Sequence, residues 1–381
     1  MTTDHFHFRT QDGEGCMNIV PVLKRLTPPL LRPPLRKCLH FVRGTSRYGP
    51  RLKAEIDTFT GIDVQDLPPI MHYWAHKYVR AMLEPFGFSN AIEFFRIRMA
   101  SLCRRDPDRT LSFLSIGAGT CASEINIAEW LRENGIENYV FQCVDINPKQ
   151  LESGRASAEE KNLASHFTFA AFDVNTWRPE RQYHVILAVQ SLHHFVELEV
   201  LFEKILQALA PDGYFLTDDM IGRNGHQRWP EALTFVQELW GELPDKYKYN
   251  HGLKRFEKEY ENWDCSTSGF EGIRSQDILP LLIERFHFDF FVAFGNIVDI
   301  FVDRCFGPNF DPENEWDRAF IDRIHALDVE EIESGRVKPT HMMAALTAKP
   351  VEHVKIHKHL SPEFCVRRPD SVSKSWLKSW F

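Results

Sequence analysis

A regular alternation of short apolar runs and helical segments through the middle of the chain constrains its fold most strongly. The apolar runs span residues 111–116, 139–144, 167–172, 185–189 and 214–217. Between the last two, the segment Leu198–Leu209 repeats apolar residues at the spacing of one helix face. Strands that alternate with helices in this way form a mostly parallel sheet with helices on both faces. We therefore predict an α/β, Rossmann-like domain.

The flanking segments divide the rest of the chain. We expect a basic, proline-containing extension over residues 1–55, a helical cap over 56–105, the α/β domain over 106–350 and a C-terminal tail over 351–381. Apolar runs at 288–294 and 342–347 complete a predicted sheet of seven strands. Two long segments, about 222–270 and 296–340, are predicted insertions after strands five and six, since connections of this length normally carry structure of their own.

Charge and cysteine usage exclude several classes of protein. The net charge of −8 and the sequence pI of about 6.1 argue against general nucleic-acid binding. The sequence has no apolar run of the length a membrane span needs, and the first fifteen residues do not resemble a secretory signal. The eight cysteines include no C-x-x-C pair, which favours reduced thiols over disulfides or a zinc site. We expect a cytoplasmic protein with no metal site.

Three polar positions follow the first three predicted strands. Gly117-Ala118-Gly119 ends the first strand, where two glycines let a ligand approach the backbone and the start of the next helix. Asp145 ends the second strand and suits a ribose diol, while Asp173 ends the third and suits an adenine amine. Each has a structural alternative: a simple turn, a helix cap for Asp145, and an ordinary loop acid for Asp173.

The glycine turn argues against a dinucleotide cofactor. A pyrophosphate site requires G-x-G-x-x-G at the start of a helix, whereas this chain has G-A-G-T-C-A. Glu124 follows closely and would repel a phosphate at that position. A positively charged sulfonium tolerates the same carboxylate.

The ordered motifs resemble those of the class I S-adenosylmethionine-dependent methyltransferases. The segments that carry the resemblance are L-S-I-G-A-G-T (114–120), V-D-I-N (144–147), F-D-V (172–174), Y-H-V-I-L-A-V-Q-S-L-H-H-F (183–195) and L-A-P-D-G-Y-F-L-T-D-D (209–219). The resemblance is strong over about residues 111–220 and concerns strand order alone over 275–348. It implies the strand order 3-2-1-4-5-7-6, with strand seven antiparallel, and S-adenosylmethionine as the cofactor. The third glycine common in such loops is missing here.

The resemblance also implies cofactor-binding residues. Gly117, Ala118 and Gly119 would border the methionine portion, Asp145 would hold the ribose, Ile146 would flank the adenine, Asp173 and Val174 would recognise the base, and Gln190 and Ser191 would lie beside the methionine. Helices that precede the core cap the cofactor in similar enzymes, which makes Tyr73 a candidate here. Its alternative is a place in the core, where aromatic residues at helical spacing are usually found.

Acceptor-side candidates follow strands four and five. His193 and His194 lie just past the fourth strand, where a histidine can accept a proton from a hydroxyl or amine, and Asp219 ends the fifth strand as an alternative base or an orienting partner. Positioning alone can also support methyl transfer. Further substrate candidates are Arg223, His226, Arg228 and Arg274, whose arginines suit a carboxylate or phosphate. Their alternative role is in structural salt bridges.

These features predict an enzyme that methylates a hydroxyl or amine of a small molecule, including a sugar- or lipid-linked one. The N/D-P-P-Y/F motif of related nucleic-acid methyltransferases is absent from the fourth strand, which carries Gln190-Ser191-Leu192-His193. Two alternatives stay open: an RNA- or protein-modifying methyltransferase, and a non-catalytic S-adenosylmethionine-binding protein.

The two ends of the chain suggest a peripheral contact with an anionic membrane surface. Nine lysines and arginines and no acids lie between Lys24 and Lys53, and the C-terminus interleaves Trp376, Trp380 and Phe381 with lysines. An ordinary solvated surface is the alternative. The oligomeric state is not predicted.

Overall fold

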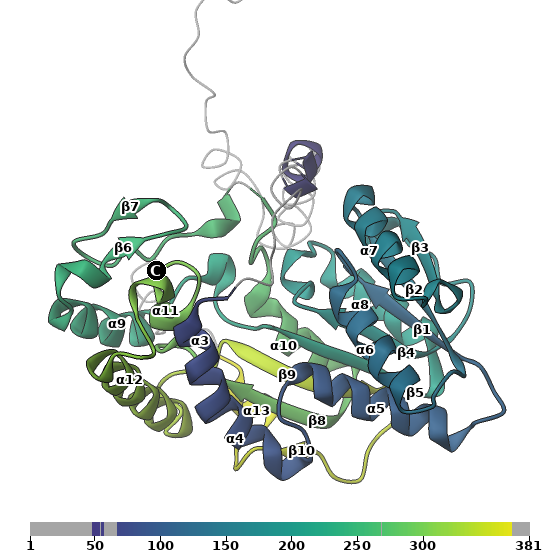
Figure 1. Cartoon of the computed structure of the whole chain (residues 1–381). Coiled ribbons are helices and arrows are strands. Elements are labelled where there is room, and N and C mark those ends of the chain that lie inside the picture. The colour runs from purple at the N-terminus through teal and green to yellow at the C-terminus, as the bar shows by residue number, and fades with distance from the viewer. Residues whose placement is uncertain (1–47, 54, 57–66, 268, 368–381) are drawn as a thin grey trace, which may run out of the picture. The chain divides into compact units, whose positions relative to one another are not determined.

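The computed structural model describes residues 48–53, 55–56, 67–267 and 269–367. Its central sheet has eight strands in the order β10-β8-β9-β5-β4-β1-β2-β3 (Figure 1). These strands are β1 (Leu111–Ile116), β2 (Tyr139–Asp145), β3 (Phe167–Ala171), β4 (Tyr183–Val189), β5 (Leu209–Met220), β8 (His287–Phe294), β9 (His341–Thr347) and β10 (Lys355–Ile356). A separate two-stranded sheet is formed by β6 (Tyr249–Asn250) and β7 (Arg255–Phe256).

The sheet has the predicted strand order with one addition. Strands β1 to β5 run parallel to one another, whereas β9 is antiparallel to both β5 and β8. With β8 and β9 as the sixth and seventh strands, the order is 3-2-1-4-5-7-6, as expected. The predicted count of seven strands is wrong, because β10 pairs with β8 at Phe290 and Phe291 and adds an eighth. Two residues are too few to leave an alternating pattern in the sequence.

The helices, seen in Figure 1, are α3 (Pro69–Trp74), α4 (Arg80–Leu83), α5 (Ala91–Arg105), α6 (Ala122–Glu133), α7 (Pro148–Glu160), α8 (Leu198–Ala208), α9 (Pro230–Glu242), α10 (Ser275–Arg285), α11 (Asp299–Val302), α12 (Glu315–Glu333) and α13 (Pro362–Cys365). Short helical turns are η2 (Ala75–Val79), η3 (Glu84–Phe86), η4 (Ala164–His166), η5 (Val174–Thr176), η6 (Leu192–His194), η7 (Asn224–His226), η8 (Asp245–Tyr247), η9 (Cys265–Thr267) and η10 (Gly307–Asn309).

Two apolar cores lie on opposite faces of the sheet. Successive residues of one strand point to opposite faces, and Val185 of β4 accordingly belongs to one core while Ile186 belongs to the other. Helices α5, α6 and α7 cover the first face. The second core contains residues of α8 and α10, including the predicted apolar stripe of α8. Leu209, the last residue assigned to that stripe, instead begins β5.

The two predicted insertions pack against each other through aromatic side chains. The ring of Trp240 from α9 lies 4.8 Å from Phe306 and 6.3 Å from Phe301, measured between ring centroids. Phe301 in turn contacts Phe320 of α12 edge to face. Segments separated in the sequence by β8 thus form one subdomain, and Figure 1 shows α9, α11 and α12 together on the left.

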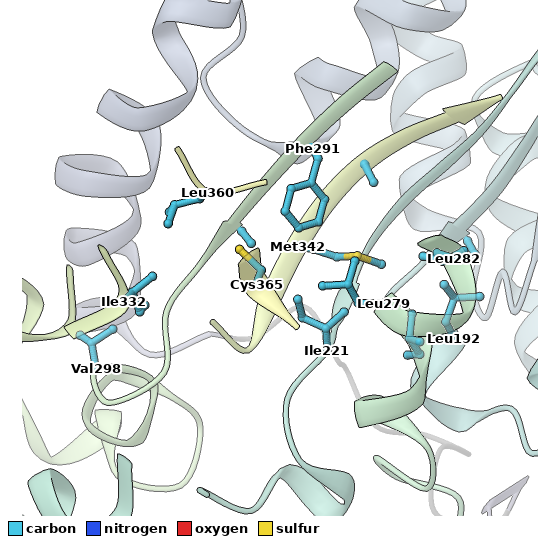
Figure 2. Packing of buried hydrophobic residues seen from close by; sticks show 14 of the residues in the cluster. Leu192, Ile221, Leu279, Leu282, Phe291, Val298, Ile332, Met342, Leu360 and Cys365 are labelled. Atoms are coloured by element: carbon cyan, nitrogen blue, oxygen red, sulfur yellow. The ribbon is translucent and has the colours of Figure 1, made fainter. Parts of the chain in front are cut away.

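Helix α10 supports the turn that carries the two adjacent histidines. Figure 2 shows Leu279 and Leu282 of α10 in the same apolar cluster as Leu192, Ile221 and Met342. Leu192 is the first residue of η6 and is fully buried. Burial of this leucine anchors η6 at the end of β4.

Several predictions concern the ends of the chain. The tail predicted from residue 351 contains structure, namely β10 and α13. Most of the basic stretch between Lys24 and Lys53, and the terminal Trp376, Trp380 and Phe381, lie outside the described residues. Within the described part, none of the helices combines the length and the apolar character that crossing a membrane requires.

Candidate active site

The glycine turn after β1 is held between the ends of β2 and β4. The amides of Gly117 and Ala118 donate to the carbonyl of Val144, at 2.8 and 3.0 Å. Gly117 has a φ of 69°, and a Cβ on it would lie 2.6 Å from the Cβ of Ser191. Gly119 also has a positive φ, of 54°. Glycine is therefore required at position 117 both by backbone conformation and by the close approach of β4.

Asp145 is fixed at the end of β2 by backbone amides. Its Oδ2 accepts from the amide of Gly119 and its Oδ1 accepts from the amide of Asn147, both at 2.8 Å. Burial raises the pKa of this carboxyl group, and the backbone hydrogen bonds oppose that rise. Each oxygen retains acceptor capacity, so the carboxylate fits a ribose diol at this edge. Asn147 caps α7 by accepting from the amide of Lys149, so the capping role that was an alternative for Asp145 falls to its neighbour.

Asp173 and Val174 lie past the end of β3. Asp173 caps η5 by accepting from the amide of Asn175 at 2.8 Å, and Val174 is buried. Asp173 thus has a structural role as well as the predicted one toward adenine. Ile146 is half-buried after β2, beside the Asp145 carboxylate.

Gln190 and Ser191 connect β4 to its neighbours. Gln190 has a φ of 49°, and its amide donates to the carbonyl of Asp218 at 2.8 Å. The Ser191 hydroxyl donates to the carbonyl of Ile116 at 2.9 Å. Both residues therefore lie at the edge where the first, fourth and fifth strands end, although the Ser191 hydroxyl is used in holding β1 and β4 together.

His193 forms a buried pair with Asp219. Its Nδ1 lies 2.7 Å from Asp219 Oδ1, and both side chains are almost fully buried. The other carboxylate oxygen of Asp219 accepts from the amides of Ser191 and Leu192, at 2.9 and 2.7 Å. Burial opposes protonation of His193, but the carboxylates of Asp219 and Glu271 outweigh it and raise its pKa to about 10. Asp219 thus has the predicted orienting geometry.

Glu271 joins three histidines. Its Oε1 lies 2.5 Å from His226 Nε2 and 3.3 Å from His193 Nε2, and its Oε2 lies 3.6 Å from His194 Nε2. Burial would raise the pKa of Glu271, but its hydrogen bonds to His193 and His226 hold that pKa well below its usual range. Burial lowers the pKa of His226, against the effect of Glu271.

His194 faces a second carboxylate. Its Nδ1 lies 2.5 Å from Oε1 of Glu55, whose other oxygen accepts from the amide of Phe270 at 2.9 Å. His194 lies in the η6 turn, and Ser191, directly before that turn, packs against Gly117 of the glycine turn. The histidine cluster therefore adjoins the proposed ribose-binding edge.

Three other candidates make structural contacts. The hydroxyl of Tyr73 donates to Asp322 of α12 at 2.9 Å. Arg274 contacts Glu199 and Asp277, and the guanidinium of Arg223 donates to the carbonyl of Arg228. These contacts are the salt bridges and packing that stood as alternatives to substrate binding.

Arg228 belongs to a buried polar network next to the histidine cluster. It is 3% exposed, donates to the carbonyls of Asn296 and His226 at 2.9 Å each, and lies 3.3 Å from Asp299. His341 lies 3.4 Å from the same Asp299 oxygen. Arg228 therefore supports the backbone of His226.

Sequence reasoning missed Glu271 and Glu55 as members of the site. Glu271 lies between Gly269 and Gly272 in a segment whose glycines beside aromatic residues are a weak signal of a functional loop. Glu55 falls at the end of the predicted N-terminal extension, where nothing in its neighbourhood distinguishes it. Both reach the cluster through long-range contacts that a linear pattern does not encode.

The polar strand ends fall within a segment that matches a known domain family. A family model described as a methyltransferase domain matches residues 114–215. This match covers the glycine turn, Asp145, Asp173 and the histidine pair. The matched segment is thus similar to methyltransferase domains, as the ordered motifs predict.

Individual proteins resemble the chain more distantly. The iterative polyketide synthase afoE of Emericella nidulans is 25% identical over 163 residues, which make up 41% of this chain and 5% of that protein. The chain thus corresponds to a small fraction of this much longer relative. Among solved structures, an O-methyltransferase from a trans-AT polyketide synthase multienzyme of Brevibacillus brevis is 14% identical with a TM-score of 0.39, over 75% of this chain and 85% of that one. Geranyl diphosphate C-methyltransferase from Streptomyces coelicolor is 12% identical with a TM-score of 0.36, over 66% and 76%.

Proposed function

We propose that this protein binds S-adenosylmethionine at the carboxyl ends of β1 to β4 and transfers its methyl group to a hydroxyl of a small molecule. The observation that carries the proposal is the position of His194, which has a carboxylate partner in Glu55 and lies in the η6 turn beside the glycine turn. A base that belongs to the acceptor side therefore lies next to the residues suited to the cofactor.

The cofactor side uses backbone amides and carboxylates. The glycine turn admits the methionine portion, Asp145 accepts from the ribose hydroxyls, and Asp173 with Val174 contacts the adenine. Ala118, Ile146, Gln190 and Ser191 complete this side. No lysine or arginine belongs to this set, which suits a cofactor whose reacting centre is a sulfonium rather than a phosphate.

His194 accepts the proton of the acceptor hydroxyl at its Nε2 atom. Glu55, beside Nδ1, holds the ring and stabilises the imidazolium that forms. When bound, S-adenosylmethionine supplies an electrophilic methyl carbon, and the departing sulfur keeps the electron pair of the broken bond. Asp219 positions His193, and the η6 turn keeps both histidines at the end of β4. His226 reaches the same cluster from the insertion.

A small acceptor fits the charge of the protein better than a nucleic acid. The chain is acidic overall, and the histidine cluster contains three carboxylates, which would repel a phosphate backbone. The six cysteines of the described part are free thiols, in line with the cytoplasmic location proposed from their spacing.

A carbon acceptor is a second candidate. An enolisable carbon next to a carbonyl must also lose a proton before methylation, so the same histidine would serve. The sequence similarity to an iterative polyketide synthase favours this candidate, because polyketide chains contain such carbons.

A transfer screen with methyl-labelled S-adenosylmethionine tests the function. Full-length protein is incubated with fractions of small metabolites, RNA and protein, and the label is followed into each. We expect label in the small-molecule fraction and S-adenosylhomocysteine binding by calorimetry. Label in RNA or protein instead would overturn the acceptor class, cofactor binding without any transfer would favour a non-catalytic role, and absence of cofactor binding would overturn the proposal as a whole.

A further inference from the structure

Two imidazoles and one carboxylate converge from three separate segments of the chain. One ring nitrogen each of His193 and His226 and a carboxylate oxygen of Glu271 all lie within 4.8 Å of one another. Oxygen Oε1 of Glu271 is 2.5 Å from one histidine nitrogen and 3.3 Å from the other. Atoms bound to a zinc-sized cation at about 2.1 Å lie about 3.4 Å apart in a tetrahedral site. Small side-chain movements would therefore bring all three atoms to bonding distance of one ion.

The orientation of His193 is fixed by a carboxylate behind it. Asp219 Oδ1 lies 2.7 Å from Nδ1 of His193, and this carboxylate accepts from three backbone amides, those of Ser191, Leu192 and Met220. A metal ion would displace the proton on Nε2 of His193, which faces Glu271, while the proton on Nδ1 stays with Asp219. Carboxylate–histidine pairs of this kind orient ligands in metal sites and raise their basicity.

The other two residues are brought together by a backbone contact between their loops. The amide of Gly225 donates to the carbonyl of Gly272 at 2.8 Å, and the amide of Ile273 donates to the carbonyl of His193 at 3.0 Å. A Cβ on Gly272 would lie 3.0 Å from the Gly225 nitrogen. Glycine at this position therefore allows the close approach that places His226 against Glu271.

The charge of the cluster favours a cation. Three carboxylates face the histidines: Asp219 is buried, Glu55 has a side chain 12% exposed, and Glu271 has a side chain 34% exposed. The guanidinium of Arg228 donates to the backbone of His226 and is paired with Asp299. The three carboxylates carry a charge of −3 together, which is costly to bury without a compensating positive charge, and a divalent cation would supply one. The exposed part of Glu271 leaves a side open to solvent.

We propose that His193, His226 and Glu271 bind a divalent transition-metal ion, with Asp219 as the outer partner of His193. Two imidazoles and one carboxylate suit Zn²⁺, Fe²⁺, Mn²⁺ or Co²⁺ and leave positions for a further ligand. The role of the ion rests on the proposed function: it takes the acceptor oxygen beside His194 and stabilises its negative charge as the proton leaves. Spacings of 33 and 45 residues match no zinc-binding pattern, which explains why the sequence alone predicts no metal site.

Cobalt titration of tag-free, full-length protein tests the site. The protein is freed of metal with a chelator and titrated with Co²⁺ while the visible absorption is followed, and Zn²⁺ is then added as a competitor. We expect one tight Co²⁺ per chain, displaced by Zn²⁺. Absence of a saturable single site in the wild-type protein would overturn the proposal.

Two variants remove ligands with little disturbance of the backbone. His226→Asn suits the positive φ of 53° at this residue, since asparagine tolerates that conformation, and Glu271→Gln keeps the size of the side chain. We expect each to weaken Co²⁺ binding by about 100-fold or more, and Asp219→Asn to weaken it by about 10- to 100-fold. His194→Asn is the matched control and should change the affinity by less than about threefold, because His194 is not one of the ligands. Wild-type affinity in His226→Asn, with an unchanged thermal unfolding midpoint, would contradict the assignment.

Calorimetry with S-adenosylhomocysteine on the same samples separates this inference from the proposed function. Cofactor binding without Co²⁺ binding removes the metal site and leaves the methyltransferase. Co²⁺ binding without cofactor binding leaves the metal site and removes its role in methyl transfer. His226→Asn should retain the wild-type affinity for S-adenosylhomocysteine within about twofold, which also verifies that the variant is folded.

Discussion

The two halves of the candidate site are built in different ways. The cofactor half consists of consecutive strand ends: the glycine turn follows β1, Asp145 ends β2 and Asp173 follows β3. The acceptor half gathers Glu55, the histidine pair, His226 and Glu271 from segments up to 216 residues apart (271 minus 55). Backbone amides dominate the first half, whereas ionisable side chains dominate the second.

This difference separates the two tasks of the site. Parallel strands bring their carboxyl ends to one edge, so a cofactor site arises wherever glycine and an acid follow neighbouring strands. The acceptor half depends on loops 224–226 and 270–273 that contact each other and the η6 turn. Changes in the cofactor half should therefore affect affinity, and changes in the acceptor half should affect turnover.

The largest expected effect is on turnover. His194→Asn should lower kcat by about 10²- to 10⁴-fold, the usual contribution of a general base, and should change the affinity for S-adenosylhomocysteine by less than about twofold. Steady-state rates with the acceptor found in the transfer screen measure the first, and calorimetry measures the second. His251→Asn, at an exposed contact with Asn309, is the control with wild-type kinetics. An unchanged kcat in His194→Asn would contradict its role as the base. Catalysis would then depend on positioning alone or on Asp219 as the base.

The next effect is on cofactor affinity. Asp145→Ala should weaken S-adenosylhomocysteine binding by about 2 kcal/mol or more, since a charged acceptor of hydrogen bonds is lost. Turnover at saturating cofactor should fall far less than in His194→Asn. Calorimetry on Asp173→Ala measures the loss of cofactor affinity at the other carboxylate of the cofactor half, for comparison with Asp145→Ala. Equal affinity of wild type and Asp145→Ala would refute the ribose-binding role.

A smaller effect concerns stability, and two glycines with similar backbone angles measure it. Gly117 and Gly135 have φ values of 69° and 71°, but an added Cβ meets Ser191 at 2.6 Å in the first case and nothing within 4 Å in the second. Gly135→Ala should cost about 1–2 kcal/mol from backbone strain, and Gly117→Ala about 1–3 kcal/mol more from overpacking. Denaturant unfolding compares them. Equal losses of unfolding free energy in the two variants would mean that Ser191 does not restrict the space at Gly117.

The smallest effect is on the pH dependence of stability in the buried network beside the acceptor half. Burial, together with the charge of the neighbouring Asp299, raises the pKa of Asp328 to about 7, against hydrogen bonds from the amides of Ile297 and Asn296. An acid with a raised pKa in the folded state contributes stability that is complete below about pH 4 and is lost as the pH rises toward 7.

Asp328→Asn should remove this decline. Its unfolding midpoint, followed from pH 4.5 to pH 8, should fall by a few degrees less than that of the wild type. The slopes of the unfolding midpoint against pH are compared, not the midpoints themselves. Asparagine has only one of the two acceptor oxygens of Asp328 and therefore lowers stability at every pH. Parallel curves for the two proteins would show that Asp328 stays ionised throughout this range.

The local order of residues largely determined the sheet and the cofactor half. Strand β1 has the predicted bounds, and β2, β3 and β4 differ from the prediction by one or two residues. The apolar runs and the turn chemistry that produce these strands act over a few residues, and so they are legible in a single sequence. The same holds for the placement of Gly117, Asp145 and Asp173 at one edge, because parallel strands impose it.

Tertiary structure alone decided the acceptor half. The contact between Gly225 and Gly272 places Glu271 against His226. Arg228, which the sequence suggested as a substrate-binding residue, instead belongs to a buried network with Asp299. The two-residue strand β10 likewise exists because β8 offers it an edge. Contacts between distant segments depend on how loops pack in space. Such contacts produce no periodic pattern or fixed spacing of residues in the sequence. The sequence by itself therefore determined the sheet and the edge proposed to bind the cofactor, whereas packing between insertions decided which side chains gather in the proposed acceptor half.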